Sequence, residues 1–416
     1  MFSLSQLTKF WLSLLCFAAV SNFYVSQPSA AEREGYGIHT PGGAGGEIYH
    51  VTNLNNSGPG SLREGLFSPG PRIIRFAVGG TIALNGRLRV LGSYITIDGL
   101  SAPYPGITLR NYGLHFSGDK GVHDIIMQGI RVGPTTGSPG SEDGITISHG
   151  AYNIVVYRCS FRGATDENAG VVKGAHDVTF LENIIADPSL SHDTNMLIDK
   201  GAYHVSLVRN LFIGATRRNP WITHDNDAGG SAPRTTADVV NNVMYDVSGT
   251  GTDHGSVAFG GAAVNFIGNY IQTNHSDPGA QKRGIVLCRG SNTPEDHSFC
   301  KNGRRPAGEV FVADNISAEG WTQYLNQKGT TSAPLPAADV VLMHACDAAQ
   351  YVLDHAGAWP RDSYDTILIA GVVVTGCNGG PVIPSESPGT TSDDKKKKKD
   401  DKKKKKDDKK KNKEKG

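Results

Sequence analysis

One short pattern occurs three times between Asp143 and Pro220. It reads ITISHGAYNIVVYRCSF at Ile145–Phe161, VVKGAHDVTFLENI at Val171–Ile184 and MLIDKGAYHVSLVRNLF at Met196–Phe212. In each copy an alternating apolar run meets a Gly-Ala pair and a second alternating run follows, with 24 and 27 residues between successive pairs. Alternation with a period of two predicts β-strands, and strands that recur every few tens of residues are typical of a solenoid. We therefore expect an all-β fold of stacked coils.

Asparagine recurs at one place in these strand runs. It is found at Asn183, Asn210, Asn242, Asn269 and Asn315, with Cys159 at this place in the first copy. Stacked amides can hydrogen-bond to one another along a solenoid axis, so we predict a structural asparagine ladder. A solenoid also needs caps over its end coils. We expect these caps from the segment before Val51 and from a helix at Cys346–Ala358.

The two ends of the chain differ in composition from its body. Residues 1–31 are predicted to be an export signal, because Lys9 is the only charge, Phe10–Val20 is too short an apolar run to span a bilayer, and Ser29-Ala30-Ala31 suits cleavage. An uncleaved membrane anchor is the alternative. We expect a β-helix domain at 32–384 and a disordered linker and Lys/Asp-rich tail at 385–416. The expected product is a secreted monomer with no membrane span after cleavage.

Net charge excludes nucleic acid as the expected partner. The formal charge is +1, but the segment Asp393–Lys415 alone holds 15 Lys against 7 Asp and Glu, so the preceding part of the chain is acidic. The tail could tether an exported enzyme to an acidic polymer, or it could be a solvated segment with no partner. Of the cysteines, the sequence favours the pairs Cys288–Cys300 and Cys346–Cys377 and leaves Cys159 as a buried thiol on a strand.

Motifs along most of the body resemble those of the pectate lyases of polysaccharide lyase family 1. In chain order they are GGAGGEIYHVTNLNNSGPGSLR at Gly42–Arg63, Arg72–Val78, Ile95–Pro103, Asp143–Phe161, Thr165–Asp187, LFIGATRRNP at Leu211–Pro220, Val239–Tyr245 and Val352–Asp365. The resemblance implies a single-stranded right-handed parallel β-helix with end caps and a substrate groove along one outer face. It also implies cleavage of polygalacturonate, an acidic polysaccharide of plant cell walls, by β-elimination.

The resemblance assigns calcium ligands at the edges of the repeats. Asp143 and Glu167 match two ligands of the family, and Asp166 is adjacent to the second. Residues at matching places on neighbouring coils lie about one strand spacing apart, ~4.8 Å, so they can share an ion. Calcium prefers such oxygen ligands and leaves positions for substrate oxygens. The alternative is that these residues only form turns and caps.

Arg218 matches the catalytic arginine of the family, in Arg217-Arg218-Asn219-Pro220. Removal of the C5 proton by this arginine requires a lowered pKa, which nearby cations favour. Alternatively, Arg218 stays charged and binds the substrate carboxylate while water or hydroxide takes the proton. A further alternative is that Arg218 is a surface arginine that bridges coils and has no catalytic role. Arg217, Lys173 and His192 are expected to bind substrate, and Arg209 is a further candidate for the same role.

Three positions depart from the family pattern. A further calcium ligand of the family falls on Val171, its lysine on Thr194, and its second arginine on Thr223. These differences leave open a catalytically decayed pectin-binding protein. A pectin lyase and a polygalacturonase on the same fold are further alternatives, although the carboxylate set of polygalacturonases was not found in the sequence.

Overall fold

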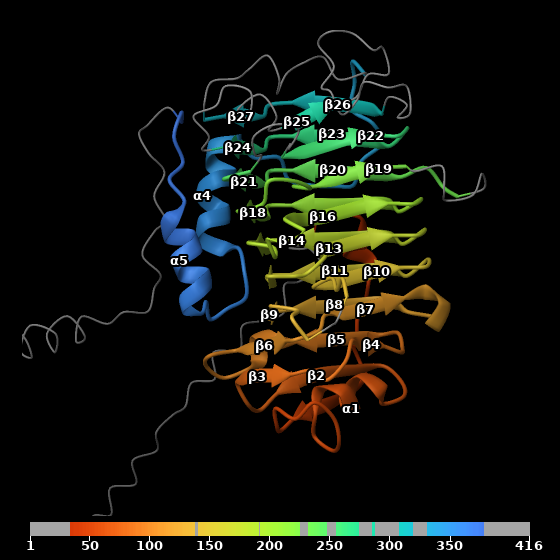
Figure 1. Ribbon diagram of the computed structural model, residues 1–416. Helices are drawn as coiled ribbons and strands as arrows, with labels where there is room; N and C mark the ends of the chain where they lie inside the picture. The colour runs from red at the N-terminus through yellow and green to blue at the C-terminus, as the bar shows by residue number, and fades with distance from the viewer. Residues whose placement is uncertain are drawn as a thin grey trace, which may run out of the picture.

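The computed structural model describes residues 34–137, 140–190, 192–224, 232–247, 255–273, 285–287, 308–318 and 331–377. In these residues three parallel sheets stack into one solenoid (Figure 1). The predicted right-handed parallel β-helix is confirmed. The expected leader, the Lys/Asp-rich tail and the Cys288–Cys300 pair lie outside the described residues. Within the described ranges, no helix has the length and apolar character needed to cross a membrane.

Each coil from β3 to β26 contributes one strand to each of the three sheets, which hold ten, nine and eight strands in the described residues. Sheet A has the order β1 (Glu47–Val51), β2 (Arg72–Phe76), β5 (Ile95–Asp98), β8 (His123–Gln128), β11 (Tyr152–Tyr157), β14 (His176–Leu181), β17 (Tyr203–Val208), β20 (Thr236–Val240), β23 (Ala263–Ile267) and β26 (Glu309–Ala313).

Sheet B has the order β3 (Gly80–Ala83), β6 (Ile107–Arg110), β9 (Ile130–Val132), β12 (Ser160–Arg162), β15 (Ile184–Ala186), β18 (Leu211–Ile213), β21 (Val243–Tyr245), β24 (Tyr270–Gln272) and β27 (Ile316–Ser317). Sheet C has the order β4 (Leu88–Val90), β7 (Leu114–Ser117), β10 (Ile145–Ser148), β13 (Glu167–Val172), β16 (Thr194–Asp199), β19 (Trp221–Thr223), β22 (Ser256–Phe259) and β25 (Ile285–Leu287). Along the chain the coils run from sheet B to sheet C to sheet A.

The core lies inside the solenoid, where each sheet directs alternate side chains. Strand β2, for example, alternates buried and half-buried residues, as the period of a strand requires. Phenylalanines from successive coils meet in this interior, and Phe116, Phe161, Phe180, Phe212 and Phe266 are fully buried. Because each coil can bury its apolar face only against its neighbours, stacking stabilises the whole array.

The predicted asparagine ladder is confirmed. Nδ2 of each residue donates to Oδ1 of the next, at 2.9 Å from Asn183 to Asn210, 2.9 Å from Asn210 to Asn242, 3.1 Å from Asn242 to Asn269 and 2.8 Å from Asn269 to Asn315. At its start, Oδ1 of Asn183 accepts a hydrogen bond from the backbone N–H of Cys159, the residue at this place in the first copy.

A second, shorter ladder was not predicted. Asn168 Nδ2 donates to Asn195 Oδ1 at 2.8 Å, and Asn195 Nδ2 donates to Asn219 Oδ1 at 2.7 Å. All three side chains are fully buried. This ladder holds the bends that lead from sheet B into sheet C, and Asn219 directly follows Arg218. It therefore fixes the backbone beside the predicted catalytic arginine.

The expected positions of the end caps were wrong. The residues before Val51 form β1, the first strand of sheet A, together with the 3-10 helix η2 (Tyr36–His39), which contacts β11, β14 and β17. The first coil is instead packed against α1 (Leu62–Phe67), which contacts β1, β2 and β4. Ser61 caps α1 by accepting a hydrogen bond from the Glu64 N–H. Two further 3-10 helices are η3 (Gly99–Ser101) and η4 (Gly118–Lys120).

The predicted C-terminal helix forms α4 (Ala345–His355), but it does not cap an end. Together with α5 (Ser363–Gly371) it lies along the outer face of sheet B beside β18, β21 and β24 (Figure 1). Its Val352 and Leu353 pack against an outward apolar row on the strands that includes Ile184 and Leu211. Because burying this second apolar row is favourable, α4 packs against the side of the solenoid and does not cover its end.

Two cysteine predictions are confirmed. Cys346 and Cys377 form a disulfide, which closes the segment that contains α4 and α5. Cys159 is a buried free thiol, and burial raises its pKa to about 12. At neutral pH it is therefore a packed, unreactive side chain.

Candidate active site

The predicted site residues converge where strands of sheet C begin. Asp143 lies two residues before β10, Glu167 opens β13, and Thr194 opens β16. Pairing of β10 with β13 places Asp143 at the level of Glu167, and Glu167 pairs with Thr194. Thr194 then forms an isolated parallel bridge with Arg217, the residue before Arg218. Successive coils thus carry acidic and cationic side chains to one edge of the sheet.

Direct contacts join these residues into one cluster. Asp143 Oδ1 accepts a hydrogen bond from the Glu167 N–H at 3.2 Å, and Asp143 Oδ2 accepts one from the Thr146 hydroxyl at 2.6 Å. The Arg218 guanidinium forms an ion pair with the Glu167 carboxylate. Both carboxylates and the guanidinium therefore occupy the same patch of the β-helix, as the sequence predicted.

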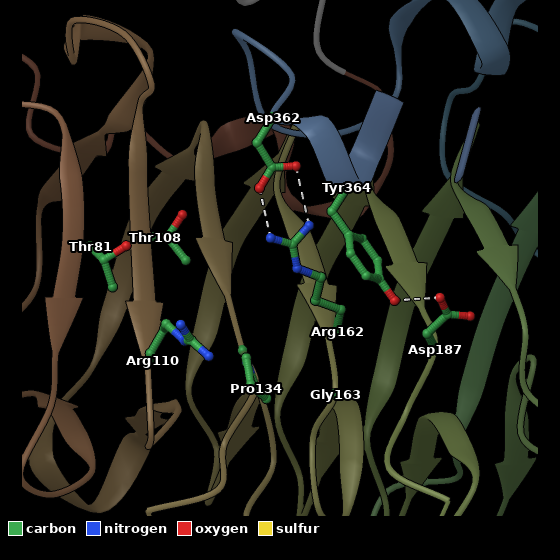
Figure 2. Close-up of a pocket in the computed structure, with 10 residues that line it drawn as sticks. Thr81, Thr108, Arg110, Pro134, Arg162, Gly163, Asp187, Asp362 and Tyr364 are labelled. Atoms are coloured by element: carbon green, nitrogen blue, oxygen red, sulfur yellow. Dashed lines mark hydrogen bonds and ion pairs between the residues drawn. The ribbon is translucent and has the colours of Figure 1, made fainter. Parts of the chain in front are cut away.

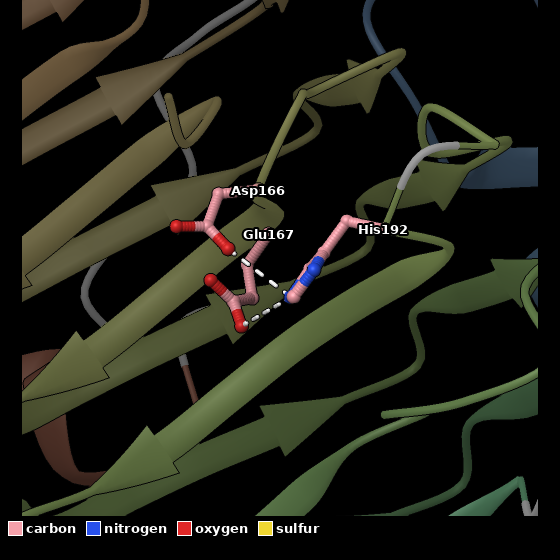
Figure 3. Close-up of side chains that lie close together, drawn as sticks. All are labelled: Asp166, Glu167 and His192. Atoms are coloured by element: carbon pink, nitrogen blue, oxygen red, sulfur yellow. Dashed lines mark ion pairs between the residues drawn. The ribbon is translucent and has the colours of Figure 1, made fainter. Parts of the chain in front are cut away.

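Three further ligand atoms gather beside Asp143. Side chains of Asp166, Glu167 and His192 each offer an atom, and these atoms lie within 4.8 Å of one another (Figure 3). His192 Nε2 is 3.1 Å from Asp166 Oδ1 and 3.7 Å from Glu167 Oε1. The carboxylates of Asp143, Asp166 and Glu167 are the hard oxygen donors that calcium prefers. His192, which is expected to bind substrate, lies against the acidic group.

Burial changes the pKa of two central side chains. It raises the pKa of Asp143 to about 6, and the nearby Asp166 carboxylate adds to this effect. Burial lowers the pKa of Arg218, although the charges of Asp166 and Asp143 oppose the shift. A buried carboxylate is costly to ionise, so a bound cation stabilises its charged form. The lowered pKa of Arg218 makes loss of its proton easier, as its role as a base requires.

The backbone at Arg218 adopts the left-handed conformation, with φ at +62°. Such a φ is uncommon for a residue with a side chain and persists where the surroundings fix it. Here the Arg218 carbonyl accepts a hydrogen bond from the Met196 N–H at 2.7 Å, and the buried Asn219 follows in the second ladder. These contacts hold the arginine at a defined place on the edge of the sheet.

The outward row of sheet C next to the acidic cluster is only partly polar. Strand register places Thr146, Gly170, Leu197 and Trp221 side by side on successive coils. The Arg218 Cζ lies 5.2 Å from the Trp221 ring centroid. Aromatic side chains often contact sugar rings through their apolar faces. Sequence reasoning missed Trp221, although it stands one residue after the Arg-Asn-Pro motif.

The predicted substrate-binding residues divide between two places. Arg217 lies beside the cluster, where its Nη2 donates to the His192 carbonyl at 2.9 Å. Lys173 follows the far end of β13, about 20 Å along the strand from Glu167, and its Nζ is 3.5 Å from His149 Nε2. Arg209 cannot serve as a substitute, because its Nη1 pairs with Glu34 at 2.9 Å on a different part of the surface.

The positions that depart from the family pattern have structural roles. Val171 is fully buried in the core, so its side chain points away from the acidic cluster. Its neighbour Gly170 faces the cluster instead, because a Cβ added there would lie 3.5 Å from Asp143 Oδ2. Thr194 and Thr223 are also buried, with exposures of 0% and 1%. Only Val171 is turned into the core, whereas Thr194 pairs with Glu167 and therefore shares its outward face, and Thr223 alternates with the inward Ile222 onto that face as well.

Comparison with known proteins identifies the family of this chain and supports its fold. No protein-family profile matches the chain. A probable pectate lyase C from Aspergillus fumigatus is 32% identical over 371 residues, which cover 89% of this chain and 82% of the relative. A probable pectate lyase C from Aspergillus terreus is 33% identical over 362 residues, which cover 86% and 80%.

Solved structures show the same architecture at lower identity. Jun a 1, the major allergen of cedar pollen, superposes with a TM-score of 0.58 at 20% identity and covers 79% of this chain and 93% of its own. A pectate lyase from Bacillus sp. N165 in complex with trigalacturonate superposes with a TM-score of 0.55 at 17% identity, with 78% and 98% covered. These likenesses support the fold.

A parallel β-helix whose curated relatives are named as pectate lyases belongs to the class of polysaccharide lyases. The identity over most of the chain to the two fungal relatives is more specific. The chain belongs to the pectate lyase family.

Proposed function

We propose that this protein is a secreted enzyme that cleaves polygalacturonate by calcium-assisted β-elimination, with Arg218 at the C5 proton. The observation that carries the proposal is the meeting of Asp143, Glu167 and Arg218 on one patch at the edge of sheet C. Names of the fungal relatives and the trigalacturonate bound to the bacterial neighbour support the substrate class. Secretion is supported by the composition of residues 1–31.

Three carboxylates would hold the ion. Asp143, Asp166 and Glu167 supply oxygen atoms, and calcium bound there would neutralise the substrate carboxylate and the negative charge that develops beside it. His192 lies close enough to Asp166 and Glu167 to orient them. The ion pair between Arg218 and Glu167 is expected to open when substrate enters, which frees the guanidinium to face the sugar.

The reaction breaks two bonds and forms a double bond. The C5 proton leaves the uronate, the bond from C4 to the bridging oxygen breaks, and the oxygen of the departing sugar gains a proton. Arg218 either takes the C5 proton itself, which its lowered pKa favours, or stays charged and binds the carboxylate while hydroxide takes the proton. Both roles place the guanidinium next to C5 and both predict an alkaline optimum.

Three alternatives give different products or requirements. A polygalacturonase would release products without a double bond, and a pectin lyase on esterified substrate would not need calcium. A decayed binding protein would retain the polymer and release nothing. Burial of Val171 in the core weakens the case for decay at this position, because its side chain does not face the acidic cluster.

The experiment is incubation of the purified full chain with polygalacturonate, with calcium or with a chelator. We expect oligomers that absorb near the ultraviolet edge through the unsaturated uronate, and no such products after chelation. Products without that absorbance would refute β-elimination. Unsaturated products that persist after thorough chelation would refute the role of the metal and favour a pectin lyase.

A further inference from the structure

Pairs of arginine and carboxylate side chains fix outer parts of the β-helix. Arg162 donates to Asp362 at 2.6 Å and 3.2 Å and so holds the start of α5 against sheet B, beside a pocket on that sheet (Figure 2). Arg87 and Glu142 form another such pair, at the edge where the strands of sheet C begin. This second pair therefore lies on the same edge as the acidic cluster.

Arg87 contacts Glu142 in a bidentate geometry. Its Nε and Nη2 atoms donate to Glu142 Oε1 and Oε2 at 2.9 Å and 2.5 Å, and Oε1 also accepts a hydrogen bond from the Gly113 N–H at 3.2 Å. The Glu142 side chain is 3% exposed, whereas that of Arg87 is 37% exposed. Because two parallel hydrogen bonds fix direction as well as distance, the Glu142 carboxylate is held toward the two preceding coils.

The backbone of Glu142 joins the two turns that carry proposed calcium ligands. Asp143 follows Glu142 directly, and the Glu142 carbonyl accepts hydrogen bonds from the Thr165 and Asp166 N–H groups, both at 3.2 Å. The Glu142 N–H in turn donates to Thr165 Oγ1 at 3.0 Å. The spacing between Asp143 and Asp166 therefore depends on the orientation of Glu142, which its side chain fixes through Arg87.

The turn that carries Arg87 is held from α1. Arg63 donates through Nη2 to the Gly86 carbonyl at 3.1 Å and through Nη1 to the Arg87 carbonyl at 3.4 Å. A continuous series of contacts thus runs from α1 through Arg87 and Glu142 to the acidic cluster. This series gives a structural reason for Arg63, the last residue of the Gly42–Arg63 motif.

We propose that Arg87 and Glu142 are positioning residues, which hold Asp143 and Asp166 at the spacing that calcium binding requires. The inference rests on the proposed function, because it takes these two aspartates as calcium ligands. Neither Arg87 nor Glu142 contacts the ion or the reacting sugar in this role. Replacing residues that orient metal ligands typically weakens metal binding by about 10–100-fold.

The test uses a double variant that keeps the net charge. Arg87→Gln alone would leave the buried Glu142 carboxylate without its partner and would alter the electrostatic field at the ligands, so the effects of charge and position would be mixed. Arg87→Gln combined with Glu142→Gln removes one charge of each sign. Calorimetric titration of this full-length variant should show calcium binding about tenfold weaker than in wild type.

Kinetics at saturating calcium separate positioning from substrate binding. The kcat and KM of the double variant for polygalacturonate should then stay within about threefold of wild type, because the ion restores the arrangement of its ligands. Unchanged calcium affinity would overturn the proposal. A raised KM with normal calcium affinity would also overturn it and would make Arg87 a substrate contact. If the double variant does not fold, Arg87→Lys decides, because it keeps the charge but not the bidentate geometry; wild-type calcium affinity in this variant would overturn the proposal.

Arg162→Gln combined with Asp362→Asn is the matched control, because it removes a pair of the same bidentate geometry and also keeps the net charge. It should lower the melting temperature and leave calcium affinity unchanged. A loss of calcium affinity as large as that of the Arg87 and Glu142 variant would show a general effect of destabilisation and would overturn the proposal.

Hydrogen exchange in calcium-free protein provides a measurement that does not depend on the metal. The Thr165 and Asp166 amides, which donate to the Glu142 carbonyl, should exchange at least tenfold faster in the double variant than in wild type. Wild-type protein that binds no calcium would contradict the proposed role of the metal, and the exchange rates would still report on the Asp166 turn. Equal exchange in the two proteins would overturn the positioning role itself.

Discussion

A carboxylate placed at Gly170 should strengthen calcium binding, whereas one placed at Val171 should unfold the protein. A Cβ at Gly170 would lie 3.5 Å from Asp143 Oδ2, an ordinary van der Waals distance, so Gly170→Asp adds a carboxylate to the acidic cluster without steric conflict. Val171→Asp, the change suggested by aligning the sequence to the family, directs the same group into a core position that is fully buried.

The expected gain can be worked from charge and distance. A unit charge ~2.4 Å from a divalent ion is attracted by about 3.5 kcal/mol in water, and repulsion from Asp143 at ~4 Å removes about 1 kcal/mol. Ordering one side chain costs roughly another 0.5 kcal/mol. The remainder of about 2 kcal/mol corresponds to about thirtyfold tighter binding. A charge buried at Val171 should instead lower the free energy of unfolding by more than about 4 kcal/mol.

Calorimetric titration with calcium and thermal unfolding measure the two effects. Gly170→Asp should bind calcium about thirtyfold more tightly than wild type and should show a larger calcium-dependent rise in melting temperature. Gly170→Asn is the matched control, because it has nearly the same shape without the charge. Unchanged calcium affinity of Gly170→Asp, or a folded Val171→Asp with improved affinity, would refute the assignment of the two faces.

Three further predictions concern stability. Asn210→Ala removes the acceptor of the Asn183 N–H and of its Nδ2 and should lower the free energy of unfolding by about 3 kcal/mol in denaturant titration; a loss below about 1 kcal/mol would contradict the ladder's role. Cys377→Ser opens the bond to Cys346, which spans 31 residues, and should cost about 4 kcal/mol in the chain-entropy description; no change in melting temperature would argue against it. Burial and neighbouring arginines lower the pKa of His115 to about 4, below its unfolded value of ~6.5. The unfolded state therefore binds the proton more readily, and the free energy of unfolding should rise with pH from about 4 to 6.5. His115→Gln should flatten this rise, and an unchanged slope would exclude His115 as its source.

The repeat in the sequence was sufficient to predict the solenoid, and the family resemblance singled out the acidic residues that meet on it. Period-two alternation and the recurrent Gly-Ala pairs specify coils of nearly constant length, so Asp143 and Glu167 reach the same level on neighbouring coils. The asparagine ladder followed from the same spacing. Such inferences succeed because strand register in a parallel β-helix is strict, and a residue's place in the coil fixes its place on the surface.

The same alternation failed to identify the face of Val171. Counting by two from Glu167 would turn Val171 outward, toward the calcium ligands. Asn168 and Ala169, however, both point inward and are fully buried, because Asn168 joins the second asparagine ladder. Two successive inward residues shift the alternation by one position, which turns Gly170 outward. A side chain that satisfies backbone groups at a bend can thus override a strand period.

The place of α4 and the pairing of Arg162 with Asp362 were also beyond the sequence. The sequence of an amphipathic helix does not specify which surface its apolar face will pack against. Here both the outward apolar row of sheet B and the end coil are apolar surfaces that α4 could cover. Arg162 and Asp362 come from segments far apart in the chain, and only the packing of α5 against sheet B brings them together. The Asp362 side chain that caps α5 was the one local signal that could have revealed this helix.

The rate of unsaturated product formation by Arg218→Ala, measured together with its calcium affinity, tests the central claim most directly. The variant should lose a factor of about 10²–10⁴ in kcat, and its calcium affinity should stay the same or increase, because Glu167 is released from its ion pair. Loss of calcium binding in parallel with activity, or a kcat within tenfold of wild type, would contradict the assignment of Arg218 to the reacting C5 proton.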